Sequence, residues 1–238
     1  MATPESQIIT LALWLLVIKF SQISVYPYLK PALKDLSYGL AYPISALLLA
    51  LISWFTAMAG IPVQCVLIFF AVLFAFAFYK KQYELNELKK QFIYDVIFLS
   101  AFSLLLIVRW FNPGIVLTGE KFMDSAFLSS IMINPTVIPN DPWLSGADLS
   151  IYYYLGHWLF GVLGVIALGA SSVVFNLMLP TVFAFAAVSA YAIGVLLLNH
   201  HRWLPMLVLI IPNTALLIES FSGRSLTEIW WNSTRVIG

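Results

Sequence analysis

Two carboxylates, Glu120 and Asp124, stand four residues apart in a long polar stretch of the chain. Residues at this spacing share one face of a helix, where like charges repel by a few tenths of a kcal/mol. One interpretation is a solvated face, which the positive N-terminus of a helix favours. The other is a carboxylate site suited to a general base or a metal ion, and the spacing alone leaves both open.

A second group of residues follows in the same stretch, where Asp141, Pro142 and Trp143 come directly after Pro139 and Asn140. One interpretation is a turn fixed by proline, with the tryptophan anchored at the membrane interface. The other is a rigid wall of a binding site, with the Asp141 carboxylate facing that site. The sequence favours neither interpretation over the other.

Tyr152, Tyr153 and Tyr154 precede His157 at the start of a hydrophobic segment. Three consecutive tyrosines point around most of a helix, so they cannot all face lipid headgroups. An intramembrane histidine is either hydrogen-bonded in the core or functional. Arg109 ends another hydrophobic segment, and its guanidinium either reaches for the interface or holds a lipid phosphate.

The composition excludes a soluble globular domain as the setting of these residues. Hydrophobic residues make up 61% of the chain and charged ones 10%, whereas soluble domains carry about 25% charged residues. The net charge of +1 gives no sign of nucleic-acid binding. The single cysteine, Cys65, excludes a disulfide framework, and the histidines lack the spacing of zinc ligands.

Seven hydrophobic segments predict an all-α, polytopic transmembrane helix bundle, because about 20 apolar residues cross the hydrocarbon core. Lys19 interrupts the first segment, and Gly60 with Pro62 predicts a tight turn between the second and third. The fifth is short and either tilts or crosses only partly. The segments are Ile8–Val25, Leu40–Ala59, Ile61–Tyr79, Phe92–Trp110, Tyr153–Leu168, Val173–Leu198 and Leu204–Ile218.

Two polar loops orient this bundle. Lys80–Gln91 holds four lysines and two glutamates, and the positive-inside rule places it in the cytoplasm. The long acidic loop Phe111–Ile151 then lies outside, as does the N-terminus. Within that loop, Glu120–Ile133 predicts a short amphipathic helix along the membrane surface.

Ordered motifs run along nearly the whole chain and together resemble the YYY membrane protein family (Chlor_Arch_YYY), which is named for its YYYxG motif. The matching residues are Pro27, Asp35, Tyr38-Gly39, Arg109, Asn112-Pro113, Gly119 to Asp124, Asp141-Pro142-Trp143, Gly146, Tyr152 to His157 and Trp230 to Ile237. Several motifs in the same order are much more specific than any one of them.

The resemblance implies a fold like that of the GT-C glycosyltransferases. Such an enzyme moves a sugar from a polyprenyl-phosphate donor to a hydroxyl of a glycan or protein acceptor on the extracytoplasmic side, with inversion. The resemblance also implies catalytic roles for Asp124 and Glu120, and we expect Asp124 to be the general base. We expect substrate contacts from Arg109, Asp141, Trp143, Tyr152, Tyr153, Tyr154, His157 and Arg235. No cofactor is required, although the carboxylate pair permits a divalent cation.

The resemblance also divides the chain into N-terminal helices and a cytoplasmic loop over residues 1–91, and the start of a GT-C-like module over 92–238. The external acidic loop occupies 110–151 of that module. Members of the YYY family are longer, so we expect an N-terminal fragment that lacks part of the site, in the plasma membrane.

Two other functions fit the same sequence: a polytopic transporter of a lipid or polar solute, and a non-catalytic membrane scaffold. If the protein is an enzyme, Glu120 and Asp124 should lie in an external cavity that Tyr152 to His157 also line. If it is a transporter, a polar path should run through the bundle. If it is a scaffold, both carboxylates should face bulk water.

Overall fold

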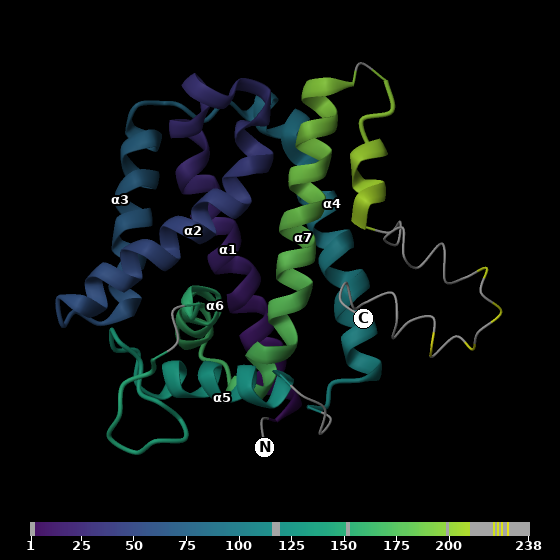
Figure 1. Cartoon of the computed structure of the whole chain (residues 1–238). Coiled ribbons are helices and arrows are strands. Elements are labelled where there is room, and N and C mark those ends of the chain that lie inside the picture. Colours follow the sequence, from purple (N-terminus) through teal and green to yellow (C-terminus); the bar gives the residue numbers. More distant parts are fainter. Residues whose placement is uncertain are drawn as a thin grey trace.

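The computed structural model describes residues 3–115, 120–150, 153–198 and 200–209, together with 221, 223, 225 and 228 (Figure 1). Its helices are α1 (Pro4–Leu33), α2 (Ser37–Met58), α3 (Val66–Tyr79), α4 (Leu85–Phe111), α5 (Glu120–Ile133), α6 (Leu155–Ile166) and α7 (Ser171–Leu197). Short 3-10 helices are η1 (Lys34–Leu36), η2 (Val63–Cys65) and η3 (Leu204–Leu209). The described residues contain no strand, so the predicted all-α bundle is confirmed.

Three helical stretches are long and apolar enough to cross a membrane: Pro4–Met58, which comprises α1 and α2, then α4 and α7. The protein is therefore an integral, multi-pass membrane protein.

The expectation of seven crossing helices needs correction for two of them. Helices α3 and α6 have only 14 and 12 residues, so their lengths of about 21 and 18 Å fall short of a hydrocarbon core about 30 Å thick. Of the expected span Leu204–Ile218 the structure describes only Leu204–Leu209, which forms a 3-10 helix, and the remainder lies outside the described residues.

Helix α1 packs along α2, and α4 packs along α7. The N-terminus of α1 is capped by Thr3, whose hydroxyl accepts a hydrogen bond from the Ser6 N–H at 3.3 Å. Trp14 lies in the core of the bundle. It is fully buried, and its indole N–H donates a hydrogen bond to the Thr181 hydroxyl of α7 at 3.0 Å. A buried indole N–H needs such a partner, and this bond ties α1 to α7.

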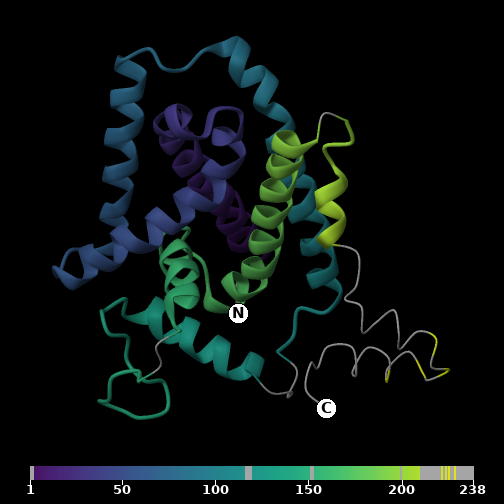
Figure 2. The same cartoon turned by 45° about the horizontal axis from the view of Figure 1, so that its top comes forward.

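The predicted turn between the second and third segments is confirmed. Gly60 lies there with φ of +72°, a left-handed conformation that glycine adopts without steric strain. The chain then enters η2 and α3. Helix α3 stands on the opposite side of the α1–α2 hairpin from α4, and residues 80–84 connect the two (Figure 2).

The connection from α3 to α4 is fastened to α1 by Tyr83. Its hydroxyl donates to the Ile23 carbonyl at 3.1 Å, and burial raises the pKa of Tyr83 to about 12. Because the phenol stays neutral over the physiological range, this hydrogen bond holds the connection between α3 and α4 against α1.

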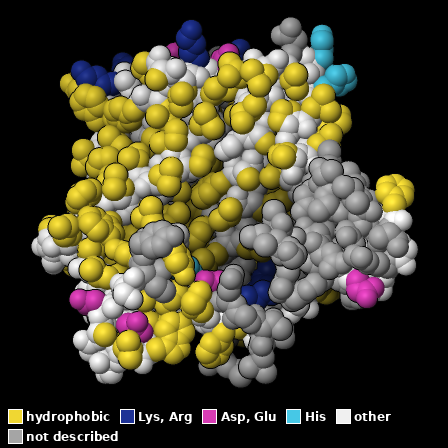
Figure 3. Space-filling view, in the orientation of Figure 1, with side chains coloured by type: hydrophobic (Ala, Val, Ile, Leu, Met, Phe, Trp, Pro, Cys, Tyr) yellow, Lys and Arg dark blue, Asp and Glu magenta, His cyan; other side chains and the backbone are white. Residues whose placement is uncertain are grey.

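The two polar loops lie at opposite ends of the bundle. The 80–84 connection is at the top of Figure 1, whereas α5 and the N-terminus are at the bottom. Lys and Arg side chains gather at the top in Figure 3, and hydrophobic side chains cover the flank between the two ends. The predicted placement of the two loops at opposite ends is therefore confirmed, and which end faces the cytoplasm stays a prediction.

Helix α5 lies across the bottom of the bundle and packs on α6 and α7. It has the predicted bounds, Glu120–Ile133. Its buried face comprises Phe127, Leu128 and Ile131. Opposite Ile131 stands Gly161, where an added Cβ would lie 2.7 Å from Ile131 Cγ2, so the glycine permits the close approach of α5 to α6.

Candidate functional site

The packing of α5 on α6 brings two predicted site residues together. The distance from His157 Nε2 to Asp124 Oδ1 is 3.2 Å, which is hydrogen-bonding distance. The Asp124 side chain is 36% exposed and that of His157 only 14%. The Asp124 carboxylate is thus accessible, while the more buried His157 imidazole fixes the orientation of that carboxylate.

The second imidazole nitrogen of His157, Nδ1, is buried and has no hydrogen-bond partner among the described residues. The ring also packs edge-on against Phe127, with centroids 5.7 Å apart. Because Phe127 holds one side of the ring and Asp124 bonds its far nitrogen, the imidazole has little rotational freedom.

An aromatic wall continues from this pair into the acidic loop. Trp143 packs edge-on against Phe127 with centroids 5.2 Å apart, and its side chain remains 52% exposed. An exposed indole beside a carboxylate is suited to the apolar face of a sugar ring. The loop is joined to α5 by Ser130, whose hydroxyl donates to the Asn140 carbonyl at 2.6 Å.

Asp141 forms a turn within its own loop. Its Oδ1 accepts hydrogen bonds from the backbone N–H groups of Trp143 at 2.8 Å and Leu144 at 3.1 Å. This Asx-type turn accounts for the interpretation of Asp141-Pro142-Trp143 as a turn. These bonds fix the backbone at Trp143, and the expected substrate contact of Asp141 stays a prediction.

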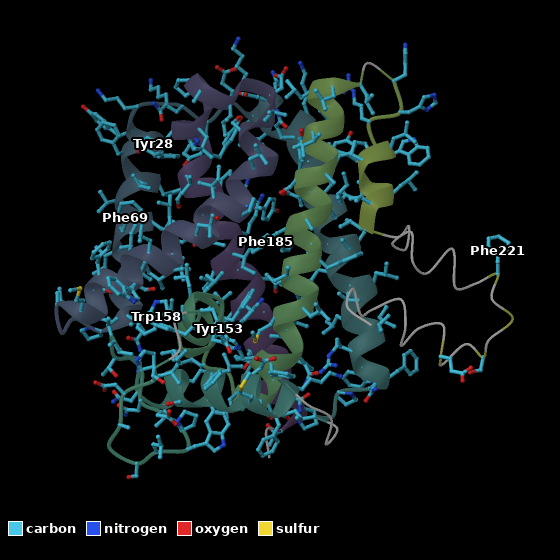
Figure 4. All side chains as sticks on the ribbon, viewed as in Figure 1. Tyr28, Phe69, Tyr153, Trp158, Phe185 and Phe221 are labelled. Atoms are coloured by element: carbon cyan, nitrogen blue, oxygen red, sulfur yellow. The ribbon has the colours of Figure 1, made fainter. Side chains whose placement is uncertain are left out.

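The two described tyrosines of the YYY motif point in different directions. The Tyr154 hydroxyl accepts a hydrogen bond from Trp54 Nε1 of α2 at 2.9 Å. Tyr153 is half exposed and lies with Trp158 in the lower part of the bundle (Figure 4). Trp158 in turn donates to the Ser53 hydroxyl at 3.0 Å, so α6 is anchored to α2 by two indole hydrogen bonds.

Arg109 lies apart from this pair, at the C-terminal end of α4. Its Nη2 donates to Asn176 Oδ1 of α7, and its guanidinium carbon lies 6.0 Å from the centroid of the Phe175 ring. The Nε atom is buried without a partner among the described residues. A buried, unsatisfied donor on a cation is a natural contact for an anionic group.

Arg109 also lines a cavity of about 680 Å³ at this end of the bundle. The ends of three helices and the residues after α4 line it, it is open to the surface, and its wall is mainly apolar. The lining residues are Pro4, Gln7, Ile8, Leu11, Leu106, Arg109, Trp110, Pro113, Gly114, Ser172, Val173, Asn176 and Leu177. A large apolar cavity with a few converging polar groups is typical of a ligand site.

Three of the predicted site residues are not placed by these contacts. Tyr152 and Arg235 lie outside the described residues, and Glu120 is described in its backbone alone. The divalent-cation hypothesis for Glu120 and Asp124 therefore stays a prediction. Among the residues described, no group of three or more His, Cys, Asp or Glu side chains is placed to hold a metal ion.

Asn176 and Phe127 were not identified from the sequence. The signal for Asn176 is an amide inside an apolar helix, which in a membrane needs a polar partner. Phe127 is one of several apolar residues of α5, and nothing in the sequence distinguishes it as a support for His157.

Residues 45–238 match the model of a family described as uncharacterized membrane protein (DUF2298). No curated protein and no solved structure matches the chain. The match covers most of the chain and includes Arg109, Asp124, Trp143 and His157. The chain therefore belongs to the DUF2298 family of uncharacterized membrane proteins.

Proposed function

We propose that the protein is a membrane glycosyltransferase that takes a sugar from a polyprenyl-phosphate carrier on the extracytoplasmic side. The observation that carries the proposal is an accessible carboxylate, Asp124, bonded to His157 at the end of the bundle where the cavity of Arg109 also lies. The resemblance to the YYY family and its GT-C-like architecture supports the same reaction.

In this reaction Asp124 accepts the proton of the acceptor hydroxyl as the hydroxyl oxygen attacks the anomeric carbon. The bond from that carbon to the phosphate oxygen breaks on the opposite face, and the lipid phosphate leaves with the electron pair. Attack and departure on opposite faces give inversion. A positioned general base contributes roughly 10²–10⁴-fold to such a rate.

His157 positions the base. Its Nε2 lies against Asp124 Oδ1, so the other carboxylate oxygen is the one that we assign to the acceptor hydroxyl. Trp143 and Phe127 provide the aromatic wall for the sugar ring. Tyr152, Arg235 and a divalent cation near Glu120 remain part of the proposal on the resemblance alone.

Arg109 is the group that we assign to the lipid phosphate. A guanidinium binds phosphate oxygens through parallel N–H bonds, and Asn176 holds one end of the fork. The apolar wall of the cavity is suited to the first part of the lipid chain. Phosphate and base would thus sit on neighbouring sides of the N-terminal part of α7, which α5 also contacts.

The test is transfer of labelled sugar from a polyprenyl-phosphate donor in membranes that contain the protein. Asp124→Asn keeps the shape of the side chain but removes the base, so transfer should fall at least 100-fold. Asp148→Asn, in the same loop but exposed, should transfer at the unaltered rate. Undiminished transfer by Asp124→Asn would eliminate Asp124 as the base.

One observation favours a transporter as the second candidate. Lys19 of α1 and Asp95 of α4 form an ion pair inside the membrane-spanning part of the bundle, with Nζ and Oδ1 2.7 Å apart. However, the small void beside the neighbouring Tyr42 is lined mainly by Ile18, Leu49 and other apolar side chains, so no polar path leads away there. Solute uptake into vesicles, abolished by Asp95→Asn, would favour transport.

A further inference from the structure

Exposed lysines gather at the end of the bundle that lies opposite the candidate site, where η1 and the connection from α3 to α4 are found (Figure 3). The exposed lysines of this lysine-rich end are Lys34, Lys80, Lys81, Lys89 and Lys90. Among the described residues, the ion pair at this end joins Lys30 to Glu87 and uses none of the five. The exposed carboxylates nearby are those of Asp35 and Glu84, so positive charge is in excess.

Two of these lysines occupy backbone positions that ordinarily favour glycine. Lys34 ends α1 with φ of +47°, and Lys81 follows α3 with φ of +53°. A residue that has a Cβ atom is strained at such values of φ.

The turn at Lys81 is a common way to end a helix. The Lys81 N–H donates to the Phe78 carbonyl at 2.9 Å, and the Gln82 N–H donates to the Ala77 carbonyl at 3.0 Å. These are the bonds of a Schellman motif, and its left-handed position is usually a glycine. The geometry of the turn therefore does not explain why a lysine occupies it.

The position of the Lys80 side chain indicates what the lysines meet. Phe76 and Tyr79, near the C-terminal end of α3, are both exposed. Exposed aromatic rings near the end of a membrane helix lie at the level of the lipid headgroups. Lys80 Nζ lies 5.6 Å from the centroid of the Phe76 ring and 5.8 Å from that of Tyr79. The side chain therefore folds back along α3 toward the bilayer, and its charge stays at headgroup level.

The spread of the lysines favours an extended anionic surface as their partner. Lys80 and Lys81 follow the end of α3, whereas Lys89 and Lys90 lie near the start of α4, beyond the connection that crosses this end of the molecule (Figure 2). A compact anion needs cations that converge on one point. The phosphate groups of a leaflet form a layer instead, and clusters of roughly four to eight Lys or Arg beside a membrane span bind such layers.

We infer that the lysine-rich end binds the phosphate groups of anionic phospholipids in the adjacent leaflet, with Lys80 and Lys81 as its main contacts. The ammonium groups bind the headgroups, and the exposed rings of Phe76 and Tyr79 contact the upper part of the acyl chains. The inference concerns the end of the bundle away from Asp124 and does not depend on sugar transfer.

The test compares two spin-labelled lipids, phosphatidylglycerol and phosphatidylcholine, in phosphatidylcholine vesicles that contain the protein. Electron paramagnetic resonance gives the fraction of each lipid that the protein immobilises. Phosphatidylglycerol should associate at least about fivefold more strongly, since one lysine near an anionic surface contributes about that factor. The preference should vanish in 1 M salt, where the Debye length is about 3 Å.

Variants then locate the contact. Lys80→Gln with Lys81→Gln should reduce the preference for phosphatidylglycerol at least about fivefold. Lys80→Gln alone should reduce it by a smaller factor. The matched control is Lys121→Gln, which removes an exposed lysine from α5 at the opposite end and should leave the preference unchanged.

Lys81→Gly separates lipid binding from a structural role. Glycine removes the charge and also the strain at a φ of +53°. We expect a melting temperature in detergent no lower than that of the unaltered protein, together with a weaker preference for phosphatidylglycerol. A lysine that served the fold alone would give the opposite pair of results.

Three results would overturn the inference. Equal association of the two lipids would show that this end does not select anionic headgroups. A preference that survives Lys80→Gln with Lys81→Gln would place the bound lipid elsewhere on the protein. Equal losses in Lys80→Gln and Lys121→Gln would show that net charge alone is responsible.

Discussion

The guanidinium of Arg109 is only partly satisfied by the protein. Nη2 bonds Asn176, whereas Nε is buried without a partner among the described residues. Leaving a buried charged donor unbonded is unfavourable, so the side chain is prepared for an anion that the protein itself does not supply. Substitution of Arg109 is therefore a direct test of phosphate binding.

Arg109→Lys tests that assignment. The lysine ammonium keeps the charge but cannot hold Asn176 and a phosphate in one planar fork. Loss of one hydrogen bond to a charged group costs about 1.5–3 kcal/mol, so binding of a polyprenyl phosphate should weaken by about 10–150-fold. Affinity is measured by titration of the purified protein in nanodiscs.

The control is Arg202→Lys, beyond the C-terminal end of α7 and away from the cavity. It should bind the lipid phosphate as the unaltered protein does. Equal affinity of Arg109→Lys and the unaltered protein would contradict the assigned role of Arg109.

Individual residues of the site could be named from the sequence, but their pairing could not. Asp124 and His157 were both candidates because of their charge and position, yet they are 33 residues apart. Their contact depends on how α5 crosses α6, which no local pattern encodes. For the same reason nothing in the sequence pairs Lys19 with Asp95, which lies 76 residues away in the chain.

At the scale of helices, Gly161 sets the distance between α5 and α6. Its missing side chain leaves the space that Ile131 fills, and Asp124 stands on the same helix as Ile131. The geometry of the candidate site therefore depends on a residue that does not belong to it.

Gly161→Val should push α5 away from α6. Overpacking of this kind costs about 1–3 kcal/mol, and it should lengthen the distance from Asp124 to His157. We expect a lower melting temperature in detergent and a sugar-transfer rate reduced at least tenfold. Gly156→Val, on the same helix but with open space at its Cβ, should change the melting temperature much less. Equal melting temperatures of the two variants would contradict this account.

Helix boundaries show what the pattern of residues does and does not determine. The bounds of α5 were predictable because Gly119 precedes it and Pro135 follows. Helix α6 is shorter than its hydrophobic run because Leu168 takes a φ of +54° and the Gly169 N–H closes the end on Gly164. Helix α1 instead continues past Pro27, because tertiary contacts such as that of Tyr26 with Glu87 support its last turns.

At the scale of the whole molecule, the fold separates a lysine-rich end from the end that carries the candidate site. That separation follows from hydropathy and charge, which is why the placement of the two polar loops at opposite ends could be predicted from the sequence. The number of crossings could not, because α3 and α6 are apolar but have only 14 and 12 residues. Hydropathy shows that a segment lies in apolar surroundings, but it does not show whether the helix is long enough to cross the membrane.

The predicted sidedness is tested by cysteine labelling in intact cells. In a Cys65→Ser background, Ser145→Cys in the acidic loop should react with a membrane-impermeant maleimide added outside. Lys81→Cys in the lysine-rich loop should react only after permeabilisation. Both positions are exposed, so accessibility does not bias the comparison. The reverse pattern of labelling would invert the topology and place the candidate site in the cytoplasm.

The separation of Lys19 from Asp95 in the chain has a consequence for biogenesis. Helix α1 leaves the ribosome well before α4, so Lys19 must be inserted into the membrane before its carboxylate partner exists. A lysine near the centre of a helix opposes insertion by about 2.5–3.5 kcal/mol on the translocon scale. Gln22 on the same helix and Tyr38 on the next are synthesised before α4, and both accept hydrogen bonds from the Lys19 ammonium. These bonds offset part of the cost of inserting Lys19, so the hairpin of α1 and α2 can be stable in the bilayer before α4 is inserted.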